Sequence, residues 1–181
     1  MKKNVLVFGL IAGGIVSAFM AVTLGMCYDS PNFEHSMLLG YAAMLVAFSF
    51  VFVGIKNYRD KYNEGLITFG KAFKVGILIS LIASTLYVIT WMILFHFFIP
   101  DFMDKYSEHM LRKAQESGAS TAEIAATTAE MATYKELYKN PFMIILLTYA
   151  EILPVGLLVT IISALILKRK TRSGNSEAVA G

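Results

Sequence analysis

Residues 142–167 read FMIILLTYAEILPVGLLVTIISALIL and carry a single acidic or basic side chain, Glu151. A helix rises about 1.5 Å per residue, so roughly 20 apolar residues cross the ~30 Å hydrocarbon core of a bilayer. Lipid offers no partner to backbone N–H and C=O groups, which favours an α-helix that closes its hydrogen bonds within itself. This stretch therefore predicts a membrane-spanning helix.

Three further stretches of the same kind precede it, at Val5–Met26, Met37–Ile55 and Val75–Ile99. None of the four alternates apolar and polar residues as a barrel strand does. The chain is 56% hydrophobic and 16% charged, against roughly 45–50% and 25% in soluble domains. A soluble enzyme, a disordered protein and a nucleic-acid binder are poor interpretations of that composition. We expect one all-α domain over residues 1–172, a four-transmembrane-helix bundle, and a disordered cytoplasmic tail at 173–181.

Basic residues are distributed unevenly around these stretches. Eleven of the sixteen lie before the first stretch, between the second and third, or after the fourth, together with three acids. The two other segments between stretches contain five basic and nine acidic residues. Because Lys and Arg in short loops stay on the cytoplasmic side, we expect both termini in the cytoplasm.

The segment between the third and fourth stretches predicts an external helical hairpin at about 101–139. Apolar residues recur at helical spacing through 103–110, and Gly118 suits the left-handed position after a helix. Ser120–Glu123 has the sequence of a capping box that begins a second helix. Asn140–Pro141 supplies the N-cap and first residue of the last span.

The inner segment Lys56–Lys74 interleaves aromatic and basic residues. Rings favour the headgroup level, and cations favour an anionic leaflet. An ordinary juxtamembrane loop accounts for this pattern, and specific lipid binding is the functional alternative. In that alternative the lipid-headgroup contacts are Arg59, Lys61, Lys71 and Lys74.

The sequence also resembles a known family. Residues 54–59 (GIKNYR) and 65–76 (GLITFGKAFKVG) resemble the central signature of a bacterial four-helix membrane family, and residues 151–156 (EILPVG) and 163–168 (SALILK) resemble its closing segment. The family is the domain of unknown function 4199, found mostly in Bacteroidetes, and the resemblance extends from the first helix to Lys170. It implies a multi-pass protein of the bacterial inner membrane. It brings no activity and no catalytic residues.

Glu151 is the one carboxylate inside a predicted span, where such a group costs roughly 2.5–3.5 kcal/mol at the bilayer centre. It stands about 25 Å along the helix from Lys168, and Pro154 frees a backbone carbonyl beside it. The same depth arithmetic places Tyr41 and Thr90 at its level, so we expect a hydrogen bond from one of them. Three roles stay open for Glu151: a packed or snorkelling structural group, proton or cation handling, and catalysis.

Small residues recur every four positions along one face of the first span, which lets a neighbouring helix approach closely. This helix-packing stripe consists of Gly9, Gly13, Ser17, Ala21 and Gly25. Packing inside the bundle and homo-oligomerisation both explain it. Shorter stripes follow on the third span (Gly76, Ser80, Ser84) and on the fourth (Gly156, Thr160, Ala164).

Motifs with recognisable chemistry are missing from the sequence. Cys27 is the only cysteine, which excludes an intrachain disulfide. His35, His96 and His109 lack metal-binding spacing, so solvated or interfacial histidines are favoured over a metal site. There is no P-loop, nucleophile elbow, dinucleotide fingerprint or haem motif, and we expect no catalytic residues, no metal and no cofactor.

The role itself stays open at this point. We expect a non-enzymatic accessory, assembly or interaction protein, with the lipid bilayer around it and no nucleic acid as partner. A protein partner on the external hairpin and a homo-oligomer are the associations to consider. The alternative is a small transporter or ion-conducting oligomer that uses Glu151.

Overall fold

The computed structural model describes residues 1–27 and 33–169 and is helical almost throughout. The side chains of residues 27 and 33–38, among them Cys27 and His35, lie outside this described part, as does the predicted tail at 173–181. Six helices are present in the described ranges: α1 (Lys2–Cys27), α2 (Phe33–Tyr62), α3 (Phe69–Phe97), α4 (Phe102–Glu116), α5 (Thr121–Leu137) and α6 (Pro141–Leu167).

Four of these helices are long and apolar enough to cross a membrane: α1, α2, α3 and α6. They coincide with the four predicted stretches, which confirms the all-α class. The ends differ, because α2 continues to Tyr62 rather than ending at Ile55, and α3 begins at Phe69 rather than Val75. Hydropathy marks where a helix leaves the hydrocarbon, and a helix with polar residues continues beyond that point. The predicted inner loop is therefore only the short connection 63–68.

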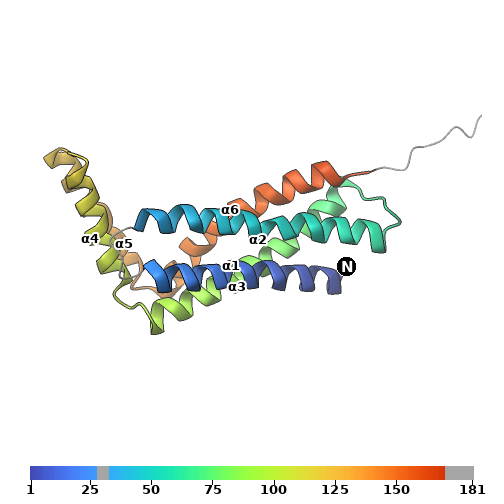
Figure 1. Cartoon of the computed structure of the whole chain (residues 1–181), viewed down its shortest axis with the longest axis horizontal. Helices are drawn as coiled ribbons and strands as arrows, with labels where there is room; N and C mark the ends of the chain where they lie inside the picture. The colour runs from blue at the N-terminus through green and yellow to red at the C-terminus, as the bar shows by residue number, and fades with distance from the viewer. Residues whose placement is uncertain (28–32, 170–181) are drawn as a thin grey trace, which may run out of the picture.

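The four long helices lie side by side, with α3 packed against α1 and α6, and α2 packed against the same two helices (Figure 1). The N-terminus of α1, the α2–α3 connection and the C-terminal end of α6 lie together at one end, which we call the basic end (Figure 1). Helices α4 and α5 lie at the opposite end. α1 and α3 run parallel, since Gly9 lies beside Ile82 and Gly13 beside Leu86.

Large apolar side chains fill the centre of the bundle. Phe48 and Ile55 from α2, Val75 and Ile79 from α3, and Ile152 from α6 are fully buried. These side chains come from three helices and fix the rotation of each about its own axis. Together with small buried hydroxyl residues such as Ser80 and Thr160, they fill the centre of the bundle.

The predicted stripes of α3 and α6 face each other. A Cβ added at Gly76 would lie 2.7 Å from Cγ2 of Thr160, and one at Gly156 would lie 3.0 Å from Cβ of Ser80. The Ser80 hydroxyl donates to the carbonyl of Gly156 (3.3 Å), and its Oγ lies 3.1 Å from Oγ1 of Thr160. The two backbones thus approach closely where side chains are small, and buried hydroxyls find partners there.

The stripe on α1 divides into two parts. Gly9 and Gly13 are buried against α3, whereas Ala21 and Gly25 are exposed. A Cβ at Gly25 would meet no atom within 4 Å. Packing within the bundle therefore explains the first half of the stripe and leaves the second half on the surface.

Helices α4 and α5 have the boundaries that the sequence predicts. Gly118 has a φ of +74°, and Ser120 and Glu123 form the capping box, with the Ser120 amide donating to Glu123 Oε2 at 2.7 Å. Those bonds from Ser120 hold the pKa of Glu123 below its ordinary range. Asn140 caps α6, and Pro141 is its first residue. The location of α4 and α5 outside a membrane stays a prediction.

Adjacent glycines in α1 provide a matched test of close helix packing. Replacing Gly13 by Leu should lower the free energy of unfolding by about 1–3 kcal/mol. Its Cβ would lie 2.6 Å from Leu86 Cδ1 and 3.0 Å from the Ala83 backbone. Gly14→Leu is the control, since a Cβ at Gly14 meets nothing within 4 Å. Unfolding of the two variants in mixed micelles measures the difference, and equal losses would contradict close packing at Gly13.

Candidate functional site

The α2–α3 connection at the basic end has a defined conformation. Glu64 and Gly65 have φ values of +52° and +76°, and the Gly65 amide donates to the Arg59 carbonyl at 3.0 Å. This reversal ends α2, and Thr68 then caps α3 by accepting from the Lys71 amide. The connection is therefore a tight turn with satisfied backbone groups.

Two reciprocal backbone hydrogen bonds tie this turn to the end of α6. The Ile67 amide donates to the Arg169 carbonyl at 3.1 Å, and the Arg169 amide donates to the Ile67 carbonyl at 2.8 Å. The Ile67 side chain is buried in the core. Arg169, just after the end of α6, is thus held against the α2–α3 connection.

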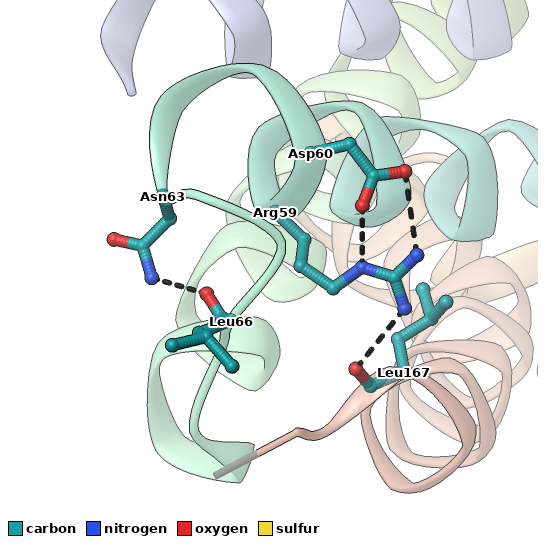
Figure 2. A network of polar contacts seen from close by, with 5 residues as sticks. All are labelled: Arg59, Asp60, Asn63, Leu66 and Leu167. Carbon is teal, nitrogen blue, oxygen red and sulfur yellow. Dashed lines mark hydrogen bonds and ion pairs between the residues drawn. The ribbon is translucent and has the colours of Figure 1, made fainter. Parts of the chain in front are cut away.

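Arg59 reinforces the same junction (Figure 2). Its Nε donates to Asp60 Oδ1 at 2.7 Å, and its Nη1 donates to the carbonyl of Leu167 at 3.5 Å. The guanidinium lies at the C-terminus of α6, where the helix dipole favours a cation. Asn63 closes the turn by donating from Nδ2 to the Leu66 carbonyl (Figure 2). Only 11% of the Arg59 side chain is exposed.

The four predicted headgroup cations divide into two groups. Arg59 is engaged as described, and Lys71 donates to Asn63 Oδ1 at 2.6 Å while its Nζ lies 5.7 Å from the Tyr58 ring centroid. Lys61 and Lys74 are exposed, so lipid contact there stays a prediction.

Tyr58, one of the aromatic residues of the predicted inner segment, is packed inside the bundle, and its height relative to a membrane stays a prediction. The side chain is only 7% exposed and belongs to the apolar core. The reason is that α2 continues past Ile55, so Tyr58 extends the buried face formed by Val51 and Ile55. Tyr62, one turn further, stacks on Tyr58 and is exposed.

Glu151 occupies an exposed position on α6. The core face of α6 is formed by Thr148, Ile152 and Gly156, which recur every four residues and are buried. A residue one position before Ile152 points about 100° away from that face. The carboxylate therefore leaves the bundle sideways rather than entering its centre.

The hydrogen bond predicted for Glu151 is absent from the described part of the chain. Thr90 donates to the carbonyl of Leu86 at 2.9 Å, as hydroxyls in apolar helices commonly do. Tyr41 is 45% exposed and makes no hydrogen bond to Glu151 there. An equal depth along the membrane normal stays a prediction, and it carries no information about how the helices are rotated toward one another. Pro154 is exposed too, and α6 continues through it.

An aromatic cluster joins the α4–α5 pair to the long helices. The rings of Trp91 in α3 and Phe102 in α4 meet edge-on, with their centroids 5.0 Å apart. The ring centroids of Phe95 in α3 and Tyr138, the C-cap of α5, are 5.4 Å apart. Burial raises the pKa of Tyr138 to about 12, and the negative charge of Glu151 acts in the same direction. The phenol is therefore neutral at physiological pH.

Beyond this cluster, α4 and α5 pack chiefly on each other. Met103 and Ser107 of α4 and Met131 of α5 are their buried residues. Lys135 Nζ forms an ion pair with Asp104 Oδ1 at 2.8 Å. Four small exposed residues lie on the side of α5 opposite Met131, and we call this set the outer face of α5: Ala122, Ala126, Ala129 and Thr133.

Sequence reasoning missed several polar groups. Asn4 is buried and donates from Nδ2 to the Gly54 carbonyl at 2.9 Å, although it follows two lysines at the expected membrane edge. Ser17 Oγ, Ser84 Oγ and Trp91 Nε1 are buried without a hydrogen-bond partner within the described residues. His96 is exposed and His109 half-buried. Across the same residues, no three His, Cys, Asp or Glu side chains are grouped to hold a metal.

Replacing Arg59 by Gln should loosen the junction at the basic end. The variant removes the cation from the Leu167 carbonyl, so amide exchange at Ile67 and Arg169 should accelerate about fivefold, a loss of about 1 kcal/mol. Lys61→Gln is the control, because Lys61 is exposed on the same helix. Hydrogen-exchange mass spectrometry measures both, and an unchanged rate in the Arg59 variant would show that the guanidinium does not hold the turn.

Comparison with known proteins gives one family. The family model described as "Protein of unknown function (DUF4199)" matches residues 7–169, which include α1 from Val7 onward and all of the later helices. No curated protein matches the chain, and no solved structure matches it.

Proposed function

The chain belongs to the DUF4199 family, and from that premise we propose that it is a non-enzymatic accessory or interaction protein of the bacterial inner membrane. In this proposal α1, α2, α3 and α6 cross the bilayer. The basic end faces the cytoplasm with both termini, and the α4–α5 pair binds a protein partner on the other side. Neither a metal nor a cofactor takes part.

The orientation is supported by charge and by the arrangement of the helices. The basic end gathers Lys2, Lys3, Lys61, Lys74 and Lys168, all of them exposed. The segment 101–139 at the opposite end, which contains α4 and α5, carries seven of the thirteen acidic residues of the chain. The positive-inside rule assigns the basic end to the cytoplasm.

One observation supports an interaction role above others: α5 buries a single residue, Met131, within this chain. Helices in proteins gain most of their stability from packing an apolar face, and an isolated helix of this length is marginal in water. Its outer face consists of Ala and Thr side chains, which allow close approach of another helix. A partner that covers this face would supply the burial that the chain itself does not.

The transport alternative requires more than one chain. The centre of the bundle is filled by apolar side chains, and Glu151 lies on its outside. A conducting path past Glu151 would have to be enclosed by a second copy. A pure homo-oligomer without another partner would favour this alternative over the interaction role.

Reporter fusions test the orientation. Fusions after Lys61 and after Gln115 should report opposite sides of the membrane, with Lys61 cytoplasmic, because the basic end and the α4–α5 pair lie at opposite ends of the bundle. A phosphatase active only outside and a fluorescent protein active only inside give complementary readouts. Reporters on the same side would overturn the proposed topology.

Purification in a mild detergent tests the interaction role. The wild-type protein should co-purify with a stoichiometric partner, and Ala129→Arg on the outer face of α5 should reduce recovery of that partner at least tenfold, since an arginine there blocks close helix packing. Gln115→Arg adds the same side chain at an exposed position of α4 and should leave recovery unchanged. Equal recovery with both variants would remove the outer face from the interface.

A further inference from the structure

A groove of about 360 Å³ lies between the N-terminal turns of α1 and the neighbouring part of α3. Its walls are apolar and come from both helices, and its mouth lies at the basic end. The lining residues are Met1, Lys2, Lys3, Val5, Leu6, Leu78 and Ile82. The groove opens onto the outer surface of α1 and α3, because Leu6 in its lining is exposed. In the proposed function this surface faces lipid.

The mouth of this groove is cationic. Lys2 and Lys3 line it and are exposed. Lys74 stands four residues before Leu78 and therefore on the same face of α3, one turn nearer the end of the bundle. No acidic residue lines the groove.

Two other cations of the basic end are already engaged, and the exposed Lys61 and Lys168 lie outside the groove. Arg59 is held by Asp60 and Leu167, and Lys71 by Asn63 and the Tyr58 ring. The lysines around the groove thus combine exposure with an adjoining apolar channel. An amphipathic anion with a long alkyl chain matches that combination, because basic residues at the membrane edge attract anionic headgroups.

We propose that this groove binds one anionic phospholipid, with an acyl chain between Leu6, Leu78 and Ile82 and the phosphate against Lys2, Lys3 and Lys74. The site depends on insertion of α1 and α3 in a bilayer, which is part of the proposed function, and does not depend on which side the basic end faces. Lipid binding and the reporter fusions therefore fail independently of each other.

Native mass spectrometry of the full chain tests the site. The purified protein is titrated in micelles with phosphatidylglycerol or phosphatidylethanolamine of identical acyl chains. Wild type should retain one phosphatidylglycerol in preference to phosphatidylethanolamine. The double variant Lys2→Gln/Lys3→Gln should bind phosphatidylglycerol about tenfold more weakly. Leu6→Trp, which fills the groove, should weaken it without a change of charge.

Two controls separate a site from general surface charge. Lys61→Gln/Lys168→Gln removes the same charge from exposed positions of the basic end outside the groove, and Leu158→Trp adds the same ring to an exposed position of α6. Both should retain phosphatidylglycerol as wild type does. Equal retention of the two lipids, equal losses in the test and control variants, or undiminished retention in both groove variants would each overturn the proposal.

Discussion

The close approach of α3 to α1 and α6 is the constraint on which the rest of the structure depends. Inside lipid, apolar side chains gain little by leaving one hydrocarbon environment for another, so helices associate through dispersion contacts and short-range hydrogen bonds. Because Gly9 and Gly13 have no side chain, α3 can pack closely against α1 on one side. Gly76 and Gly156 allow the same close packing between α3 and α6 on the other side. The Ser80–Thr160 pair lies at the second contact. The position of α3 in turn determines where the α2–α3 turn lies at the basic end and where the α4–α5 pair begins at the other end.

At the basic end, the geometry brings the α2–α3 turn beside the last turn of α6. The paired hydrogen bonds of Ile67 and Arg169, with Arg59 at the carbonyl of Leu167, make that end a closed unit. At the other end, α3 and α6 lead into α4 and α5, and ring contacts of Trp91 and Phe95 join the pair to the bundle. Because α5 buries only Met131 of its own residues, the proposed interaction is assigned to this end.

The sequence predicted the elements of this fold much better than its contacts. Apolar length, the capping box at Ser120 and the glycine at Gly118 depend on local physics, and the structure has them where expected. Whether Tyr41 or Thr90 can reach Glu151 depends on how α6 is rotated against its neighbours. That rotation is decided by Phe48, Ile152 and Gly156 together, and spacing along one chain does not contain it. The burial of Tyr58 was missed for a related reason, because hydropathy falls before the helix ends.

The outer face of α5 is an interface in the proposed function, and site-specific photocrosslinking in native membranes tests that claim most directly. A photoreactive amino acid at Ala129 should give one discrete crosslinked product, with a mass that identifies a partner or a second copy. The same amino acid at Gln115, on α4, should give little of that product. Absence of any product from Ala122, Ala126 and Ala129, with the protein expressed at its natural level, would contradict the claim.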